Sequence, residues 1–126
     1  CRLAGTRATD TQIEAIQVAH QQCEALAQAG DARVYFDANY VFHGAIWAAA
    51  NNQELVEQIT AVDKRLTPYR RQITFHPNRK QDSQTEHNQI ATALGLRQPE
   101  IAERAMREHV MILADDALQM ARDLKL

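Results

Sequence analysis

Residues 31–51 read DARVYFDANYVFHGAIWAAAN, and this stretch decides the fold class. Its bulky side chains recur at intervals of three and four, at Phe36, Tyr40, His43, Trp47 and Ala50. At about 100° per residue this spacing makes one stripe along an α-helix, which we expect to open at Asp31 and to reach about Asn51. His43 lies near the middle of the stripe, with Asn39 one turn earlier.

Two further histidines occupy the same kind of position. His87 shares a helical face with Ile90, Ala91 and Leu94, in a helix expected to begin at Asp82 or Ser83 and to end at Gly95. His109 belongs to the last predicted helix, which has Pro99 in its first turn and runs to about Leu124. That helix is expected to turn inward Ile101, Ala105, His109, Ile112, Leu113 and Met120. The pattern therefore aims three imidazoles into one helical core.

Three more helices are predicted. Cys1 to Arg7 are typical of the end of a helix, and because no capping residue precedes them we expect the chain to be a fragment of a longer protein. A second helix is expected from Thr9 or Asp10 to Gly30, with Ile13, Ile16, Ala19, Cys23 and Leu26 inward. Another begins near Asn52 and carries the stripe Leu55, Ile59, Val62, Leu66, Tyr69 and Ile73, with Pro68 as a kink or break. Residues 75–80 are predicted to be a loop.

The composition indicates one compact all-α domain. The 126 residues are 45% hydrophobic and include only four Gly and three Pro, so the chain can bury roughly two-thirds of its unfolded surface around one core. A net charge of -2 argues against nucleic-acid binding by this chain alone. No apolar run is long enough to span a bilayer and no signal peptide opens the chain, so the expected location is the cytoplasm. Cys23 is expected to be a buried free thiol.

A shared metal ion would explain the three histidines. Burying an imidazole costs free energy unless both ring nitrogens find partners, and imidazole is the commonest protein ligand of divalent transition metals. Asn39 would place its side-chain oxygen beside His43. The alternative is that each histidine is an ordinary, satisfied core or boundary residue. His20 and His76 are expected to be surface or boundary residues without a metal role.

Arg70 is a candidate for binding a small ligand. It lies about 60° from the centre of its helix stripe, and a partly buried guanidinium suits a carboxylate. The alternatives are an arginine that snorkels from the core edge or that pairs with an internal acid such as Asp116. Asp116 itself is expected to be an ion-pair partner or an exposed residue. Arg71, Arg79 and Lys80 are expected to be solvated around the loop.

These residues together resemble a known family. The motifs are Asn39-Tyr-Val-Phe42-His43, then Glu86-His87, then Ala102 with Met106 and His109. They are similar to the FCD domain, the C-terminal effector-sensing domain of the FadR subfamily of GntR-type bacterial transcription regulators, over essentially the whole chain. The resemblance implies a single domain over residues 1–126, folded as an antiparallel bundle of about six helices.

The resemblance also implies a site and partners. A divalent ion, zinc or nickel, would be held by Asn39, His43, His87 and His109, although Asn39 departs from the family's usual Asp and an amide is a weaker ligand. The effector would be a small organic acid that completes the coordination while an Arg neutralises it. The domain would act within a homodimer and reach DNA only through an N-terminal winged helix-turn-helix domain absent from this chain.

Two other functions remain open. A helical metal site could activate water in a hydrolase, but the sequence has no His-Asp dipeptide, no H-E-x-x-H and no E-x-x-H pair. Glu86 and Glu108 adjoin two of the histidines yet point about 100° away on their helices, so no general base is evident. We therefore predict that the chain is not an enzyme. A dimerisation domain that binds no ligand is the third interpretation.

Overall fold

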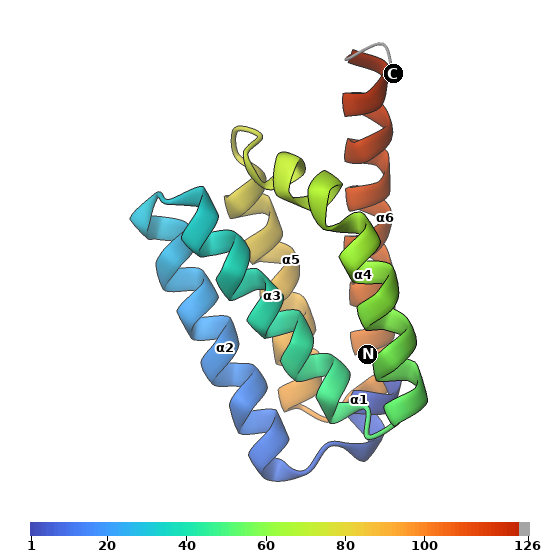
Figure 1. The fold of residues 1–126 in the computed structure, drawn as a ribbon. Helices are drawn as coiled ribbons and strands as arrows, with labels where there is room; N and C mark the ends of the chain where they lie inside the picture. The colour runs from blue at the N-terminus through green and yellow to red at the C-terminus, as the bar shows by residue number, and fades with distance from the viewer. Residues whose placement is uncertain (124–126) are drawn as a thin grey trace.

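The computed structural model describes residues 1–123 and shows six α-helices (Figure 1). They are α1 (Arg2–Arg7), α2 (Asp10–Ala29), α3 (Ala32–Ala49), α4 (Gln53–Thr74), α5 (Arg79–Gly95) and α6 (Pro99–Asp123). Leu124, near which the last helix was predicted to end, lies outside the described residues. The predicted all-α class and the count of about six helices are confirmed.

Most helix boundaries follow from capping residues. Thr9 caps α2 by accepting a hydrogen bond from the Gln12 backbone N–H, while the Gln12 side chain accepts one from the Thr9 backbone N–H. Asp31 and Asn52 cap α3 and α4 in the same way through their side-chain oxygens. Gly30 ends α2 with φ 94°, a left-handed conformation that glycine adopts without strain. The predicted boundaries of these three helices are confirmed.

One local prediction needs correction. Helix α5 begins at Arg79 rather than at Asp82 or Ser83, because Asn78 adopts a left-handed φ of 67° that turns the chain into the helix early. The connecting loop is correspondingly shorter than residues 75–80. At Pro68 a kink or a break was predicted, and helix α4 does not break but continues to Thr74. Figure 1 shows the axis of α4 changing direction in its second half, as expected of a helix that contains a proline.

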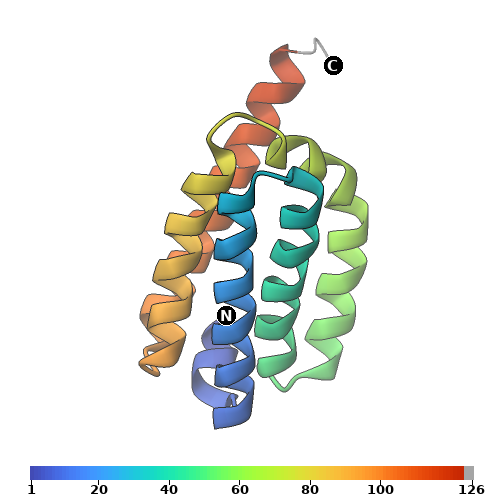
Figure 2. The ribbon, with the colours of Figure 1, turned by 90° about the vertical axis from the view of Figure 1, so that its left-hand side faces the viewer.

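The helices pack as an antiparallel bundle whose core is built by α2, α3, α5 and α6, with α1 closing one end (Figures 1 and 2). The C-terminal part of α6 extends beyond the neighbouring helices in both views. Within residues 1–123, no helix combines the length and the apolar character that a membrane span requires. The buried apolar residues of the main core are Ala4, Ala8, Ile16, Ala19, Phe42, Ile46, Ala49, Ile90, Ala91, Ala93, Leu94, Ala102 and Ala105.

The inward faces of two helices were predicted well. In α5, His87, Ile90, Ala91 and Leu94 are all buried. In α2, Ile16, Ala19 and Cys23 are buried, while Ile13 and Leu26 are half-buried. Their apolar residues form one continuous stripe, so periodicity alone locates the face that meets the core.

Other inward predictions were wrong. Tyr40 in α3 is exposed, because the true inner face of α3 is shifted toward Tyr35, Phe42 and Ile46. In α6, Ile101 and Ile112 are exposed although Ala105 and His109 are buried. The stripe of α4 is also exposed except at its last member, Ile73, because α4 turns a polar face toward the interior. That polar face borders the site described below.

Gly5 sets how closely α1 can approach α6. A Cβ atom at this position would lie 2.8 Å from the backbone Cα of Pro99, a contact that forces one helix to move. We expect Gly5→Ala to lower the free energy of unfolding by about 1–3 kcal/mol. Gly44→Ala in α3 is the matched control, since a Cβ there meets nothing within 4 Å and the change should add about 0.5–1 kcal/mol. Thermal or urea unfolding of both variants checks the prediction, and equal stabilisation by both would contradict it.

Candidate metal centre

Three helices bring their histidines together inside the bundle. His43 comes from α3, His87 from α5 and His109 from α6, and all three are buried. Their ring centroids are 5.1 Å apart for His43 and His87, 5.2 Å for His43 and His109, and 4.9 Å for His87 and His109. One nitrogen atom of each ring lies within 4.8 Å of the corresponding atoms of the other two. The triad is therefore able to hold a metal ion after small rotations, since ligand atoms at about 2.1 Å from a tetrahedrally coordinated ion lie about 3.4 Å from one another.

Three polar atoms in this cluster lack partners. Nε2 of His43, Nε2 of His109 and Oδ1 of Asn39 are buried and make no hydrogen bond within the described residues. A buried polar atom without a partner costs roughly 1–3 kcal/mol, so three of them in one place are rarely retained for stability alone. Imidazole nitrogen and amide oxygen are ligand atoms for a divalent transition metal, and the donor set therefore fits one.

His87 differs from the other two histidines because both of its ring nitrogens have neighbours. Nε2 lies 3.3 Å from the Ser83 hydroxyl and Nδ1 lies 3.3 Å from Nε2 of Gln84. Both distances are long for hydrogen bonds. Coordination by His87 would replace one of these weak contacts and keep the other to orient the ring.

Burial keeps two of the imidazoles neutral. The pKa of His43 is well below its ordinary value because the ring is removed from water, and His87, His109 and Arg70 add electrostatic repulsion of a positive charge. The pKa of His87 is lowered for the same first reason, with His109 and His20 adding to it. A neutral imidazole has a lone pair for a metal, so these two rings need not lose a proton at neutral pH to coordinate one.

Behind His109 lies a charged pair that the sequence pattern did not reveal. Nδ1 of His109 lies 2.5 Å from a carboxylate oxygen of Glu86, and Glu86 also accepts two hydrogen bonds of 2.8 Å from the Arg79 guanidinium. Burial would raise the pKa of Glu86, but the hydrogen bonds from His109 and Arg79 outweigh it and hold that pKa at about 2. An ionised Glu86 fixes the His109 ring so that Nε2 is the free nitrogen.

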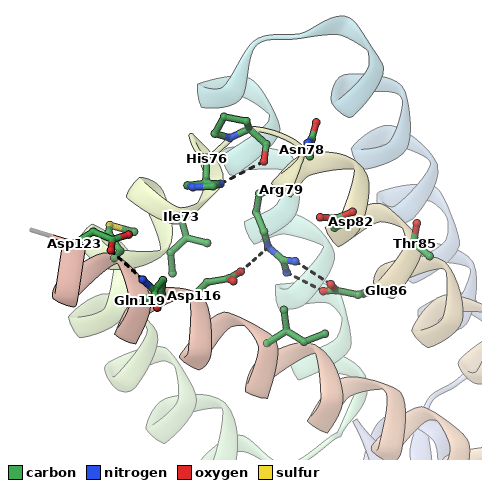
Figure 3. A pocket seen from close by; sticks show the side chains of 13 residues that line it. Ile73, His76, Asn78, Arg79, Asp82, Thr85, Glu86, Asp116, Gln119 and Asp123 are labelled. Carbon is green, nitrogen blue, oxygen red and sulfur yellow. Dashed lines mark hydrogen bonds and ion pairs between the residues drawn. The ribbon is translucent and has the colours of Figure 1, made fainter.

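The prediction that Arg79 is solvated was wrong, because its side chain is buried. Its Nε lies 3.6 Å from an Asp116 carboxylate oxygen, so the guanidinium spans α5 and α6 (Figure 3). Asp116 is confirmed as an ion-pair partner. The only sequence signal for this arrangement was the Glu86-His87 pair itself. Adjacent residues on a helix point about 100° apart, so a buried His87 turns Glu86 toward the neighbouring helix.

Arg70 lies near the histidines but its charge is already paired. The guanidinium makes an ion pair with Asp63, one α4 residue bonding another two turns away, and not with Asp116. Asp63 and Arg70 are both largely buried. Arg70 and Asn39 border an inner cavity of about 10 Å³, which holds about one water molecule. The other residues around it are Tyr35, Ile73, Thr74, Arg79, Ser83, His109 and Leu113.

A larger cleft lies outside this cavity. It has a volume of about 690 Å³ and runs between the end of α4, the start of α5 and the C-terminal half of α6 (Figure 3). Two residues, Ile73 and Arg79, border both the cleft and the inner cavity. Glu86 and Asp116 face the cleft together with Arg79. The Arg79 ion pairs therefore separate the large cleft from the space beside the histidines.

Three further residues with a predicted environment are His76, His20 and Cys23. His76 is exposed, as predicted, but His20 is buried, with its ring centroid 5.7 Å from that of Phe42. His20 lies at the margin of the α2 stripe, and it is buried because α3 packs along that side of α2. Cys23 is a buried free thiol, as predicted, and burial raises its pKa to about 11.

The fold and the cluster define a class of protein: an all-α bundle with a polar centre able to hold a metal ion. The family model described as the FCD domain matches residues 1–111. The chain belongs to the FCD family, the C-terminal effector-binding domains of GntR-family transcription regulators. No curated protein sequence matches the chain. The resemblance inferred from the motifs is confirmed at the level of this family, and the FadR subfamily stays a prediction.

Proposed function

We propose that residues 1–126 form one effector-sensing domain that binds a divalent metal and a small organic acid. The domain would act in a homodimer of a cytoplasmic regulator and modulate DNA binding by a winged helix-turn-helix domain of the full-length protein. FCD domains are regulatory domains, and membership of that family supports a regulatory role for this domain. The metal part is supported by one observation above all, the three unpartnered buried atoms at Asn39, His43 and His109.

The proposed ligands of the ion are Asn39, His43, His87 and His109. Zinc or nickel suits this set, because imidazoles and an amide oxygen match borderline metals better than magnesium or calcium. All four ligands are neutral when coordinated, so the ion keeps its double positive charge. When bound, the ion supplies an electrophilic site for a carboxylate.

The arginines beside the site supply the other half of acid recognition. Arg70 borders the inner cavity and Arg79 borders both the cavity and the cleft. An inner cavity of about 10 Å³ is too small for an organic acid, so binding requires it to open toward the cleft of about 690 Å³. The weaker of the Arg79 ion pairs, at 3.6 Å to a half-exposed Asp116, is the contact that a competing carboxylate would replace.

Neither alternative function gains support from the geometry. A hydrolase needs a general base within reach of a metal-bound water, yet the Glu86 carboxylate is already engaged by His109 and Arg79. In a domain that binds no ligand, three buried polar atoms without partners would lower the free energy of unfolding and serve no function. The proposal that the chain is a sensor and not an enzyme explains both observations.

Thermal unfolding with and without metal tests the proposed function. We expect zinc or nickel at a 100-fold excess over its dissociation constant to add about 2.7 kcal/mol, which raises Tm by roughly 10 °C in a domain of this size. Gluconate, with citrate as a second probe, should raise Tm further only when metal is present, with retained metal checked by elemental analysis. No shift with either metal would overturn the metal site. An equal gluconate shift without metal would overturn the metal-dependent mode and place the acid on an arginine.

A further inference from the structure

Gln84 lies beside His87 in the interior, where α2, α3 and α5 meet. Its amide nitrogen is 3.2 Å from Sγ of Cys23, 3.1 Å from the Tyr35 hydroxyl and 3.3 Å from Nδ1 of His87. Cys23 belongs to α2, Tyr35 to α3 and His87 to α5, and all three are buried. An amide NH2 group has two hydrogen atoms, so it can donate to only two of these three neighbours at once.

The amide oxygen of Gln84 makes no contribution in this orientation. It is buried and accepts no hydrogen bond within the described residues. Burial raises the pKa of Tyr35 to about 12 and that of Cys23 to about 11, so both carry a proton that an oxygen could accept. Half a turn about the last bond of the side chain exchanges the oxygen and the nitrogen without changing the shape. The amide oxygen would then face two donors and the His87 ring.

The orientation of this amide determines which nitrogen of His87 has a free lone pair. A neutral imidazole carries one proton, either on Nδ1 or on Nε2. When the amide nitrogen of Gln84 donates to Nδ1, the proton is on Nε2, 3.3 Å from the Ser83 hydroxyl. When the amide oxygen faces Nδ1, the proton is on Nδ1 and the lone pair of Nε2 is free. The ring carries one proton in both states, because the proton that Nε2 gives up to solvent is matched by one that Nδ1 takes up.

Nε2 is the nitrogen of His87 that can be uncovered toward the proposed metal site. Its neighbour Ser83 borders the inner cavity together with Asn39 and His109, two of the proposed ligands. The Ser83 hydroxyl turns away by rotation about one bond. The Gln84 amide on the other side of the ring is instead held by contacts with α2 and α3. A ligand therefore displaces Ser83 more easily than Gln84.

We propose that Gln84 is a positioning residue for the metal site. Its amide turns by half a turn, so that the oxygen accepts the Nδ1 proton of His87 and leaves Nε2 free to coordinate a divalent metal. This role rests on the proposed function for the existence of the ion. The present orientation leaves the amide oxygen without a partner and one of three acceptors without a proton, so it is not strongly preferred over the second.

Zinc titration of variants tests which contact is kept. Gln84→Met keeps the length of the side chain but has neither amide atom, and we expect roughly 10-fold weaker zinc binding. Gln84→Glu presents an oxygen in both orientations and should bind zinc roughly 10-fold more tightly. Ser83→Ala removes only the hydroxyl beside Nε2 and should bind zinc at least as tightly as the wild type. Gln81→Glu is the matched control, because it adds the same charge at an exposed position of α5 and should leave the affinity unchanged.

Two outcomes of the titration would contradict the role of Gln84. Wild-type affinity in both Gln84 variants would overturn it. Weaker binding by Ser83→Ala together with unchanged binding by Gln84→Met would show that Ser83 is the contact that orients the ring. Circular dichroism of each variant reports whether it is folded, and Gln84→Met keeps the test decisive if the buried carboxylate of Gln84→Glu prevents folding.

Nitrogen-15 NMR of labelled histidine separates positioning from a general loss of structure. The His87 signals, identified by their absence in His87→Gln, should show the proton on Nε2 in the metal-free wild type and on Nδ1 in the zinc-bound protein. Metal-free Gln84→Glu should already carry the proton on Nδ1. A proton on Nδ1 in the metal-free wild type, or coordination through Nδ1, would overturn the proposal. If the wild type binds no zinc, the metal site itself is wrong, and the metal-free protons still confirm or refute the control of His87 by Gln84.

Discussion

His43→Ala is expected to abolish metal binding, from about one ion per chain to nearly none. The variant removes one of three imidazoles that lie within 4.8 Å of one another, and Asn39 with the remaining two cannot hold an ion of comparable affinity. The metal-free protein should change little in stability. The cavity left by the ring costs free energy, but the change also removes a buried Nε2 that has no partner. Elemental analysis after dialysis, with unfolding curves in the presence and absence of zinc, measures both effects.

Two further variants make this result specific. His76→Ala removes an exposed imidazole outside the cluster and should keep full metal content. Asn39→Asp replaces a neutral amide by a carboxylate and should bind zinc at least 10-fold more tightly, because an anionic oxygen is the better ligand. Full metal stoichiometry in His43→Ala would show that the site proposed here is wrong.

The helices could be predicted because their ends depend on local chemistry. Thr9, Asp31 and Asn52 are capping residues whose side chains bond to backbone groups within the same turn, and Gly30 supplies the left-handed end of α2. The start of α5 could not be read in this way. Asn78 adopts a left-handed conformation without a side-chain cap, so the sequence offers no capping signal where the helix begins.

The histidines could be predicted for a similar reason. Each lies on the inner face of its own helix, and three helices in a small bundle must share one interior. The contact between Glu86 and His109 depends on how α5 and α6 pack against each other, which periodicity within one helix does not specify. The inward face of α4 was predicted wrongly because its apolar stripe was expected to pack against the core. The polar face of the helix is turned inward instead. The polar face of α4 can turn inward because Asp63 and Arg70 pair with each other there.

Glu86→Gln is expected to weaken metal binding by 10- to 100-fold, although Glu86 is not a proposed ligand. The carboxylate accepts the proton on Nδ1 of His109, which leaves the lone pair of Nε2 free to bind the ion. A glutamine keeps the shape but loses the charge that orients the ring. The variant should also lose about 2 kcal/mol of stability, because Arg79 is 8% exposed and would keep only the distant Asp116 as a partner. Zinc titration and urea unfolding measure the two effects.

Glu108→Gln is the matched control for this change. Glu108 adjoins His109 in sequence as Glu86 adjoins His87, but it is exposed on α6. We expect Glu108→Gln to leave zinc affinity and stability unchanged, because its side chain points about 100° away from His109 on the same helix. A Glu86→Gln protein with reduced stability but wild-type zinc affinity would mean that Glu86 serves only the Arg79 ion pair. The orientation of His109 would then have to come from the packing of α5 against α6 alone.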